Sequence, residues 1–307
     1  MQMNLHLLRI FAAVAEHRSF SRAASTLLIS QPAVSKAVRQ LEHQLDLSLI
    51  ERGAGGARGV RGVQLTESGQ VLFEHARGIF ALERAATEEV RARVGLKRGR
   101  LVVGASTTIA GYWLPRYAAQ FARQVPSAQL QIRVGNTEAV RQALINCEVD
   151  LALVEGQVHD ERIVVTHWRD DELHIIAHPS ALFSRRRPAA LEQLNGQAWL
   201  LREPGSGTRE VTDRLMRAQR IEPERTVEFG SNEGIARAVA AGLGLAMLPA
   251  QVVRELVRMG EIRVLTPALA AAGSLVRPLY LLQLKERPPS PLAREFCRLL
   301  SQLLETH

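Results

Sequence analysis

Two short series of apolar residues at helical spacing follow each other between Ser19 and Glu42. The first series is Ala23, Ala24 and Leu27, and the second is Val34, Val38 and Leu41. Pro32 lies between them, and proline is tolerated in the first turn of a helix, where its missing N–H would have no partner anyway. Ser30 is then placed to act as the N-cap of the second helix. The stretch therefore predicts two short helices joined by a tight turn, the helix-turn-helix arrangement.

The second of these helices carries polar and cationic side chains on its outer side: Gln31, Ser35, Lys36 and Arg39. Amides and hydroxyls can read base edges in a major groove, and cationic groups can hold phosphates. We expect Gln31 and Ser35 to specify bases, and Lys36 and Arg39 mainly to contact phosphates. An ordinary helical hairpin with a solvated polar face would show the same spacing, so the pattern alone leaves both interpretations open.

Residues 1–69 closely resemble the N-terminal domain of LysR-type transcriptional regulators. The matching positions are Leu8, Phe11, Ser19, Phe20, Ala23, Ala24, the run from Ser30 to Ser35, Leu41, Glu42, Leu49, Glu51, Arg52, Leu65, Thr66 and Gly69. The resemblance implies a winged helix-turn-helix over residues 1–66, with double-stranded promoter DNA as its partner. The DNA-binding residues that it implies are Ser30, Gln31, Pro32, Ser35, Lys36, Arg39 and Arg52.

The segment 49–66 is rich in glycine and arginine between two short apolar ends, which favours a two-stranded wing. This wing is about six residues longer than the pattern of the resembled family, and Ile50 replaces the usual Phe. We expect Arg52 to contact DNA, whereas Arg58 and Arg61 fit a phosphate contact and a solvated loop equally well.

Composition agrees with a folded protein that binds a polyanion. The chain has 307 residues, 46% of them hydrophobic, and a formal net charge of +8. Residues 1–100 hold 15 Lys and Arg against 9 Asp and Glu, so most of the excess lies with the helix-turn-helix. Only two cysteines occur, Cys147 and Cys297, and we expect the first to be a buried, inert thiol rather than a redox sensor. With no signal-peptide pattern and no long apolar run, a cytoplasmic protein without a membrane segment is expected.

Residues 67–95 predict a long helix that links two domains. Its apolar series is Val71, Leu72, Ala76, Ile79, Phe80, Leu82, Ala86 and Val90. Such a helix cannot bury the series on itself, so we expect it to pack against a second copy of the chain. Packing against its own domains is the alternative. The family resemblance favours dimerisation through this helix, and further suggests a tetramer.

Strand and helix patterns alternate after the probable hinge at 95–99, which implies a parallel sheet with covering helices. Residues 99–307 resemble the effector domain of the same family, an α/β domain of two lobes built like a periplasmic binding protein. We expect one lobe at about 99–166 and 272–307, and the other at about 167–271. The chain would cross between them near 165–169 and again near 270.

Four segments between a predicted strand and the start of a predicted helix are rich in hydroxyl and amide groups: Ser106–Thr108, Gly135–Glu138, Glu203–Arg209 and Ser231–Glu233. In open α/β lobes, ligands bind at this edge against helix N-termini, where free N–H groups suit a small anion. Arg209 could add charge. Such residues also cap helices everywhere, so each segment alone is weak evidence. Their presence on both lobes favours a site between them.

The amino-acid sequences of these segments resemble those of CysL- and CbbR-like effector domains. That resemblance implies a small effector such as sulfite, sulfate or a phosphorylated metabolite, bound without a metal or cofactor. The residues carried over by motif are Ser106, Thr107, Asn136, Glu155, Glu203, Ser206, Thr208 and Asn232. Glu155 suits an anion badly unless it accepts a hydrogen bond from the ligand or holds the lobes together.

No enzyme motif is expected, because the histidines have no metal-ligand spacing and the glycines of residues 203–210 lack the lysine of a phosphate loop. The sequence thus predicts a homo-oligomeric transcriptional regulator controlled by a small ligand, with RNA polymerase as a further partner if it is an activator. The alternative is a cytoplasmic ligand-binding or enzymatic α/β protein that uses its N-terminal domain for assembly only.

Overall fold

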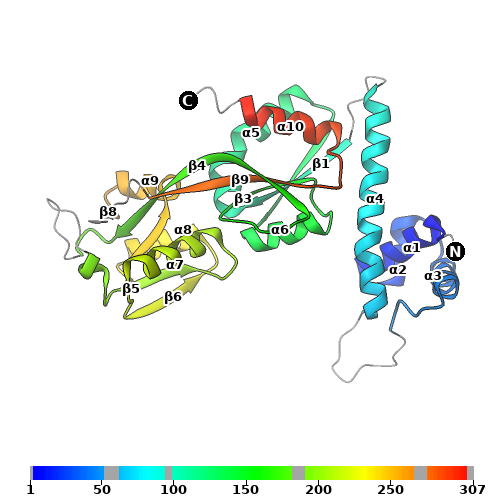
Figure 1. Cartoon of the computed structure of the whole chain (residues 1–307), viewed down its shortest axis with the longest axis horizontal. Helices are drawn as coiled ribbons and strands as arrows, with labels where there is room; N and C mark the ends of the chain where they lie inside the picture. Colours follow the sequence, from blue (N-terminus) through cyan, green and yellow to red (C-terminus); the bar gives the residue numbers. More distant parts are fainter. Residues whose placement is uncertain (1–2, 52–61, 94–98, 182–190, 266–274, 303–307) are drawn as a thin grey trace. The chain divides into compact units, whose positions relative to one another are not determined.

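The computed structural model of the chain describes residues 3–51, 62–93, 99–181, 191–265 and 275–302 (Figure 1). It divides into two compact units, Met1–Thr87 and Glu88–His307. Wing residues 52–61, the expected hinge around 95–98 and the expected second crossing near 270 lie outside the described residues. Each unit is considered by itself.

The N-terminal unit begins with three helices, α1 (Leu5–His17), α2 (Phe20–Leu27) and α3 (Gln31–Leu45), of which the last two are the predicted pair. Side chains cap all three, and the Ser30 hydroxyl accepts a hydrogen bond from the Ala33 N–H at 3.4 Å, as expected of an N-cap. Pro32 lies in the first turn of α3. Apolar faces of these helices meet in one core, in which Leu8, Phe11 and Leu41 are fully buried.

Residues of the expected wing are tied to α3 by the buried carboxylate of Glu42. Its Oε1 accepts hydrogen bonds from the N–H groups of Leu49 and Ile50, at 2.9 and 3.2 Å. Ile50 forms an antiparallel bridge with Leu65, which pairs the two ends of the segment. The carboxylate thus satisfies two buried N–H groups that a short β-bridge leaves without partners.

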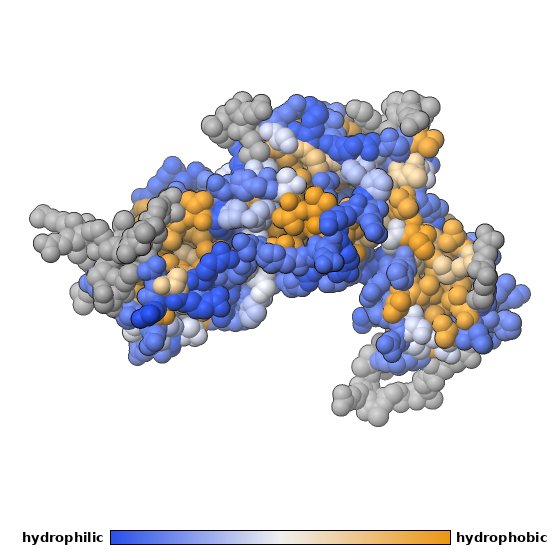
Figure 2. Space-filling view, viewed as in Figure 1, coloured by the Kyte–Doolittle hydropathy of each residue, from blue (hydrophilic) through white to orange (hydrophobic). Residues whose placement is uncertain are grey.

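The long helix α4 (Glu67–Arg93) packs partly on the helices that precede it, which was the alternative to packing against a second copy. Leu72, Ile79 and Phe80 contact the helix-turn-helix core, and Phe73 and Ala76 are buried in it. Leu82 remains 49% exposed, and Val71 and Val90 are also exposed. Figure 2 shows apolar surface gathered over the N-terminal unit. A narrower stripe than predicted is therefore available to a second copy.

The first lobe of the C-terminal unit, lobe I, is a mixed sheet whose first three strands are parallel, with helices on both faces (Figure 1). Its elements are β1 (Gly99–Ser106), a π-helical turn η1 (Ile109–Trp113), α5 (Leu114–Gln124), β2 (Ala128–Gly135), α6 (Thr137–Ile145), β3 (Leu151–Glu155) and, at the end of the chain, α10 (Pro291–Gln302). Leu101 and Val103 of β1 pack with α5 and α10, while Val102 packs with α6. Burial on both faces explains why this strand is a continuous apolar run.

Two long antiparallel strands, β4 (Ile163–Ala177) and β9 (Val276–Leu284), run from lobe I into the second lobe. From Ile163 to Glu172, β4 pairs with β9, and from Leu173 onward it pairs with two strands of lobe II. The change of partner, and hence of lobe, falls at Glu172–Leu173.

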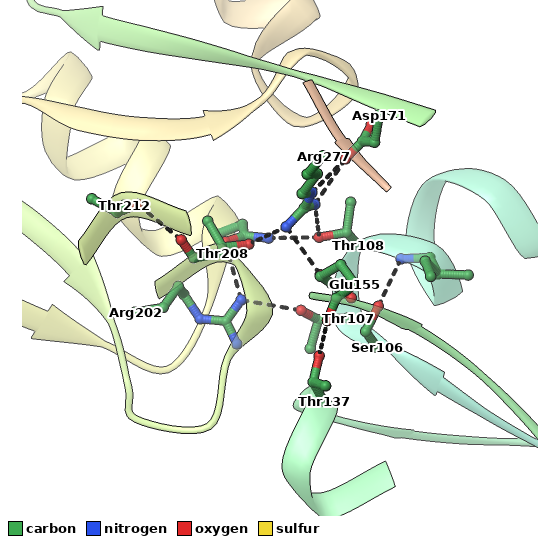
Figure 3. A network of polar contacts seen from close by, with 12 residues as sticks. Ser106, Thr107, Thr108, Thr137, Glu155, Asp171, Arg202, Thr208, Thr212 and Arg277 are labelled. Carbon is green, nitrogen blue, oxygen red and sulfur yellow. Dashed lines mark hydrogen bonds and ion pairs between the residues drawn. The ribbon is translucent and has the colours of Figure 1, made fainter. Parts of the chain in front are cut away.

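The second lobe, lobe II, contains the 3-10 turn η2 (Leu191–Leu194), β5 (Ala198–Arg202), α7 (Gly207–Gln219), β6 (Arg225–Phe229), α8 (Asn232–Ala240), β7 (Ala246–Pro249), α9 (Ala250–Arg258) and β8 (Arg263–Leu265). Its strands β5 and β6 form a parallel pair. Trp199 of β5 also forms a parallel β-bridge with Leu245, the residue directly before β7. In lobe II, α7 follows the end of β5 and α8 follows the end of β6. These strand ends face the ends of β1 and β2 in lobe I, which are followed by η1 and α6 (Figure 3).

Candidate functional site

A network of polar side chains joins the two lobes at these strand ends (Figure 3). It is centred on two arginines that the sequence analysis did not single out, Arg202 at the end of β5 and Arg277 in β9. Their exposed fractions are only 2% and 1%. Guanidinium groups buried to this degree need full hydrogen bonding and counter-charges, so their partners define the site.

Arg202 of lobe II reaches the first lobe through one nitrogen. Its Nη1 lies 3.2 Å from the Thr107 hydroxyl and 3.0 Å from Oδ1 of Asn232, and it donates to both. The other edge of the guanidinium holds the Glu203 carboxylate, with Nε–Oε2 and Nη2–Oε1 distances of 2.7 and 2.8 Å. Burial is the largest single influence on the pKa of Glu203 and acts to raise it. The hydrogen bonds and charge of Arg202, together with the hydrogen bonds from the backbone and from Asn136, outweigh burial, so that pKa lies below its usual value.

Arg277 connects both lobes from the strand that runs between them. Its Nε and Nη2 donate to Oδ2 of Asp171 at 3.0 and 2.8 Å, and its Nη1 donates to the Thr208 hydroxyl at 2.9 Å. Nη2 also lies 3.5 Å from the Thr108 hydroxyl of lobe I. Burial raises the pKa of Asp171, and the Arg277 charge opposes that rise.

Glu155, at the end of β3, is the third carboxylate of the network and is 2% exposed. Its Oε1 lies 3.5 Å from Nη1 of Arg277, while Oε2 has no hydrogen-bond partner among the described residues. Its backbone carbonyl accepts a hydrogen bond from the Thr137 hydroxyl at 2.8 Å. A Cβ at Gly207 would lie 2.4 Å from that carbonyl oxygen, so only glycine allows the start of α7 to approach so closely.

Asn136 and Asn232 both lie at the start of a helix, and both make a hydrogen bond between the lobes. Asn136 Oδ1 accepts from the Ala139 N–H at 2.9 Å, and its Nδ2 donates across the lobes to Oε1 of Glu203 at 3.2 Å. Asn232, the first residue of α8, donates from Nδ2 to the Thr108 hydroxyl at 2.9 Å. The Asn136 side chain therefore both caps a helix and joins the lobes, whereas Asn232 joins the lobes and Ser231 caps α8.

The structure thus brings six of the eight expected effector residues into one network: Thr107, Asn136, Glu155, Glu203, Thr208 and Asn232. Ser106 instead accepts from the Ile109 N–H of its own helical turn, at 3.5 Å. Ser206 is buried, and its hydroxyl does not cap α7. Sequence reasoning missed Arg202, Asp171 and Arg277, whereas Thr108 and Thr137 lay within the expected segments without being named as effector residues. For the two arginines, the available signal was a charged residue within or directly after an apolar strand.

A cavity of about 440 Å³ opens beside the network. It is lined by residues from α6, from the segment after β3, from the loop before α7 and from α7: Thr137, Glu138, Gln157, Pro204, Gly205, Ser206, Gly207, Arg209, Glu210 and Asp213. Arg209 does not offer its charge to this cavity freely, because its Nε binds Asp213 at 2.9 Å and its Nη1 donates to the Arg202 carbonyl at 2.8 Å. Its expected role in adding charge for a ligand is therefore not supported.

In the N-terminal unit, the expected DNA-reading residues lie along the outer side of α3. Gln31, Pro32, Lys36 and Arg39 are exposed, and Ser35 is partly exposed. Arg39 donates from Nη2 to the Ser35 hydroxyl at 3.1 Å. Arg52 lies outside the described residues. Within the described parts of the chain, no helix could span a membrane and no group of three or more His, Cys, Asp or Glu residues could hold a metal ion.

Comparison with known proteins matches both parts of the chain to one family. The bacterial regulatory helix-turn-helix protein, lysR family, matches residues 5–70, and the LysR substrate binding domain matches residues 95–305. The chain is 31% identical to the HTH-type transcriptional regulator CysL of Bacillus subtilis, over 86% of each chain. It is 35% identical to the HTH-type transcriptional regulator CfxR of Cupriavidus necator, over 96% of this chain and 90% of the relative.

Solved structures show the same architecture. A full-length OxyR variant from Pseudomonas aeruginosa matches with a TM-score of 0.75 and 24% identity, over 98% of this chain and 94% of that one. The CcmR regulatory domain from Synechocystis, solved in complex with 2-PG, matches with a TM-score of 0.61 and 26% identity. That match covers 67% of this chain and 97% of the CcmR domain.

Proposed function

The chain belongs to the LysR family of DNA-binding transcriptional regulators and is not an enzyme, and we propose that a small oxyanion bound between the lobes controls it. Sulfite, sulfate and phosphorylated metabolites are the candidate ligands. The alternative of an enzyme that keeps the N-terminal domain for assembly is not supported by these relatives.

The observation that carries the proposal is the fork of Arg202. Nε and Nη2 of Arg202 each donate a hydrogen bond to the Glu203 carboxylate, in the bidentate geometry that a guanidinium also offers to sulfate or phosphate. Around this fork lie Thr107, Asn232 and the start of α8, all of which can donate to an anion. The complex of the CcmR domain with 2-PG supports a small-molecule ligand in this fold.

The charges in the network favour a ligand that replaces one of its carboxylates over a ligand that is added to the network as it stands. The network holds two guanidiniums and three carboxylates, so a further anion must replace a negative group or bring its own proton. Glu203 is the carboxylate best able to leave, because its side chain is 25% exposed. An incoming oxyanion would take its place on Arg202 and release the Asn136–Glu203 contact between the lobes. The ligand would thereby change the relative stability of two lobe arrangements.

Glu155 would then select among oxyanions. Its buried Oε2 can accept a hydrogen bond that no described residue supplies. A ligand with a hydroxyl group or a retained proton would satisfy it, whereas fully deprotonated sulfate would not. Hydroxylated phosphate esters and hydrogen sulfite therefore suit this site better than sulfate does.

We further propose that Gln31 and Ser35 read bases, while Ser30, Pro32, Lys36, Arg39 and Arg52 position the duplex. The exposed stripe of α4 would form the contact of a dimer, and pairing of sensor domains a tetramer. Promoter DNA lies in the cytoplasm, where the protein would act, and RNA polymerase would be a partner if the regulator activates.

Calorimetry on the full chain tests the effector proposal with sulfite, sulfate, thiosulfate and phosphorylated sugars. Thr107→Ala removes one hydroxyl that can bond the ligand, and its binding should weaken roughly 10- to 150-fold. Thr166→Ala, an exposed threonine of β4, is the matched control and should bind like the parent. Binding of a neutral or cationic ligand alone, with no response to any of these anions, would contradict the oxyanion proposal and leave the family assignment intact.

A further inference from the structure

A further contact between the lobes lies outside the buried network, at a place that solvent reaches. The phenol of Tyr112, in η1 of lobe I, donates a hydrogen bond to Oε1 of Glu233, in α8 of lobe II, at 3.1 Å. Tyr112 is 37% exposed, and Glu233 is also exposed. The two residues are 121 positions apart in the sequence, so the bond forms only while the lobes keep this arrangement.

This contact is one of two that hold the start of α8 against η1. Thr108 and Tyr112 are four residues apart, which places their side chains on one face of a helical turn. Asn232 and Glu233 are the first two residues of α8. The Thr108 hydroxyl accepts a hydrogen bond from Nδ2 of Asn232 at 2.9 Å, next to the bond between Tyr112 and Glu233. One turn of lobe I thus bonds the first turn of a helix in lobe II at two adjacent points.

The inner side of η1 is fixed in the core of lobe I. Ile109 is fully buried there, and Trp113 packs against the same core. The Tyr112 hydroxyl therefore follows the movement of lobe I as a whole, and its bond to Glu233 depends on the relative position of the two lobes. Single π-helical turns such as η1 are rare and occur frequently at functional sites.

The Tyr112 phenol keeps its proton throughout the physiological pH range. Burial raises the pKa of Tyr112 to about 12, and the charges of Glu233 and Glu255 act in the same direction. A hydrogen bond to a charged acceptor is stronger than a neutral one, but water competes for both groups at an exposed place. We therefore expect this bond to break more readily than the buried bond between Asn232 and Thr108.

We propose that the contact between Tyr112 and Glu233 is a latch, which stabilises the ligand-free arrangement of the lobes and so opposes binding of the effector. This inference rests on the proposed function, because the oxyanion would bind Arg202 beside the start of α8. Asn232 connects the two places, since its Oδ1 accepts from Arg202 and its Nδ2 donates to Thr108. A ligand that bonds to these groups must separate α8 from η1, and the latch has to open for that separation.

Loss of the latch should therefore tighten ligand binding. The apparent dissociation constant of a ligand rises as the fraction of protein in the binding-competent arrangement falls. Tyr112→Phe keeps the ring and its packing but removes the hydroxyl that bonds Glu233. Loss of one such hydrogen bond should raise the competent fraction, and lower the apparent dissociation constant, by roughly three- to tenfold.

Hydrogen exchange of the full chain without ligand tests the latch itself. Tyr112→Phe and Glu233→Ala should each speed amide exchange in η1 and in the first turn of α8 by roughly three- to tenfold. The double variant should exchange no faster than Glu233→Ala alone, because both changes remove the same bond. Glu233→Gln keeps an acceptor oxygen, so its exchange should be slower than that of Glu233→Ala.

Tyr280→Phe is the matched control for the loss of a phenol. Tyr280 is a partly buried residue of β9 that pairs with Val154 within lobe I, and this variant should exchange like the parent. Exchange in α10, which packs in the core of lobe I, should be unchanged in every variant. Faster exchange in α10 as well would indicate a general loss of stability and would overturn the latch.

Calorimetry with sulfite and with glycerol 3-phosphate tests the consequence for the ligand. Tyr112→Phe should bind the active anion roughly three- to tenfold more tightly than the parent chain does. The latch is overturned if Tyr112→Phe binds no more tightly, if its exchange is unchanged, or if the effects of the two substitutions add. Coupled exchange effects without binding of any oxyanion would contradict the oxyanion proposal, while the latch between the lobes would stand.

Discussion

Arg277 and Asp171 are directly opposite each other on β9 and β4, with Nη2 2.8 Å from Oδ2 and both side chains 1% exposed. The pair lies one residue before β4 changes from the sheet of lobe I to that of lobe II. From this position Arg277 also donates to Thr208 of lobe II and reaches Thr108 of lobe I. The two lobes are therefore joined by a buried ion pair at the place where their relative position is set.

Replacing Arg277 by Met should lower the free energy of unfolding by about 3–5 kcal/mol, because Asp171 would keep a buried charge without its partner. Arg133→Met is the matched control, since Arg133 pairs with Glu148 at the surface, and it should cost about 1 kcal/mol or less. Urea unfolding of both variants measures the difference. Equal losses in the two variants would show that the buried pair does not hold the lobes together.

This pair also shows why part of the site could not be predicted. The expected residues at helix starts, Thr107, Asn136, Thr208 and Asn232, could be found because hydroxyl and amide residues between a strand and a helix form a pattern that is local in the sequence. Arg277 lies 106 positions from Asp171, in a strand of apolar residues with no local pattern to explain it. Its partners follow from the pairing of β4 with β9, and one sequence does not reveal which distant strands pair.

Gln31→Ala should weaken binding to the true promoter site by roughly 1–3 kcal/mol and relax sequence choice at one position. Gln31 is exposed at the start of α3, where a recognition helix contacts base edges. Lys36→Ala should instead weaken binding to all DNA alike and reduce the salt slope by about one. Titrations at several salt concentrations with cognate and scrambled duplexes separate the two effects. Unchanged selectivity in Gln31→Ala would contradict its proposed role in reading bases.

Gly69→Ala should destabilise the N-terminal unit by about 1–3 kcal/mol, because a Cβ there would lie 2.0 Å from the Leu49 carbonyl oxygen. Gly78→Ala in the same helix is the control. Nothing lies within 4 Å of a Cβ at that position, so the change should stabilise the helix by about 0.5–1 kcal/mol. Thermal melting gives both signs. Similar effects at the two glycines would show that the close approach of α4 to Leu49 is not needed.

The long helix α4 shows what the spacing of apolar residues can predict and what it cannot. The spacing predicted helix α4 and its extent closely, but one series of apolar residues serves two different neighbours. Ile79 packs on the helix-turn-helix core, whereas Leu82, three residues later, is 49% exposed. Residues three apart share a helix face, so sequence periodicity alone cannot divide them between their own domain and a second copy.

Leu82→Glu should shift the chain toward smaller assemblies, because the proposed dimer contact would have to bury a carboxylate in an apolar stripe. Burial of a leucine stabilises by about 1.5–3 kcal/mol, so the dissociation constant should rise at least about tenfold. Arg84→Glu also introduces a carboxylate on α4, about 200° around the helix from Leu82, and should leave assembly unchanged. Light scattering at micromolar concentration measures both. A monomeric parent chain under these conditions would remove the proposed contact.

Asp160 should make the C-terminal unit sensitive to acid. Its carboxylate accepts hydrogen bonds from Arg162, at 3.0 and 2.9 Å, and from Arg141 at 3.0 Å, and these interactions lower its pKa to about 2. Because the folded pKa lies below the unfolded one, the stabilisation is complete above about pH 4 and is lost as the pH falls toward 2. Asp160→Asn should therefore be less stable than the parent at pH 6, with the difference shrinking toward pH 2. Asp170→Asn, at an exposed carboxylate paired with His167, is the control, and an Asp160→Asn deficit that does not change with pH would contradict the assignment.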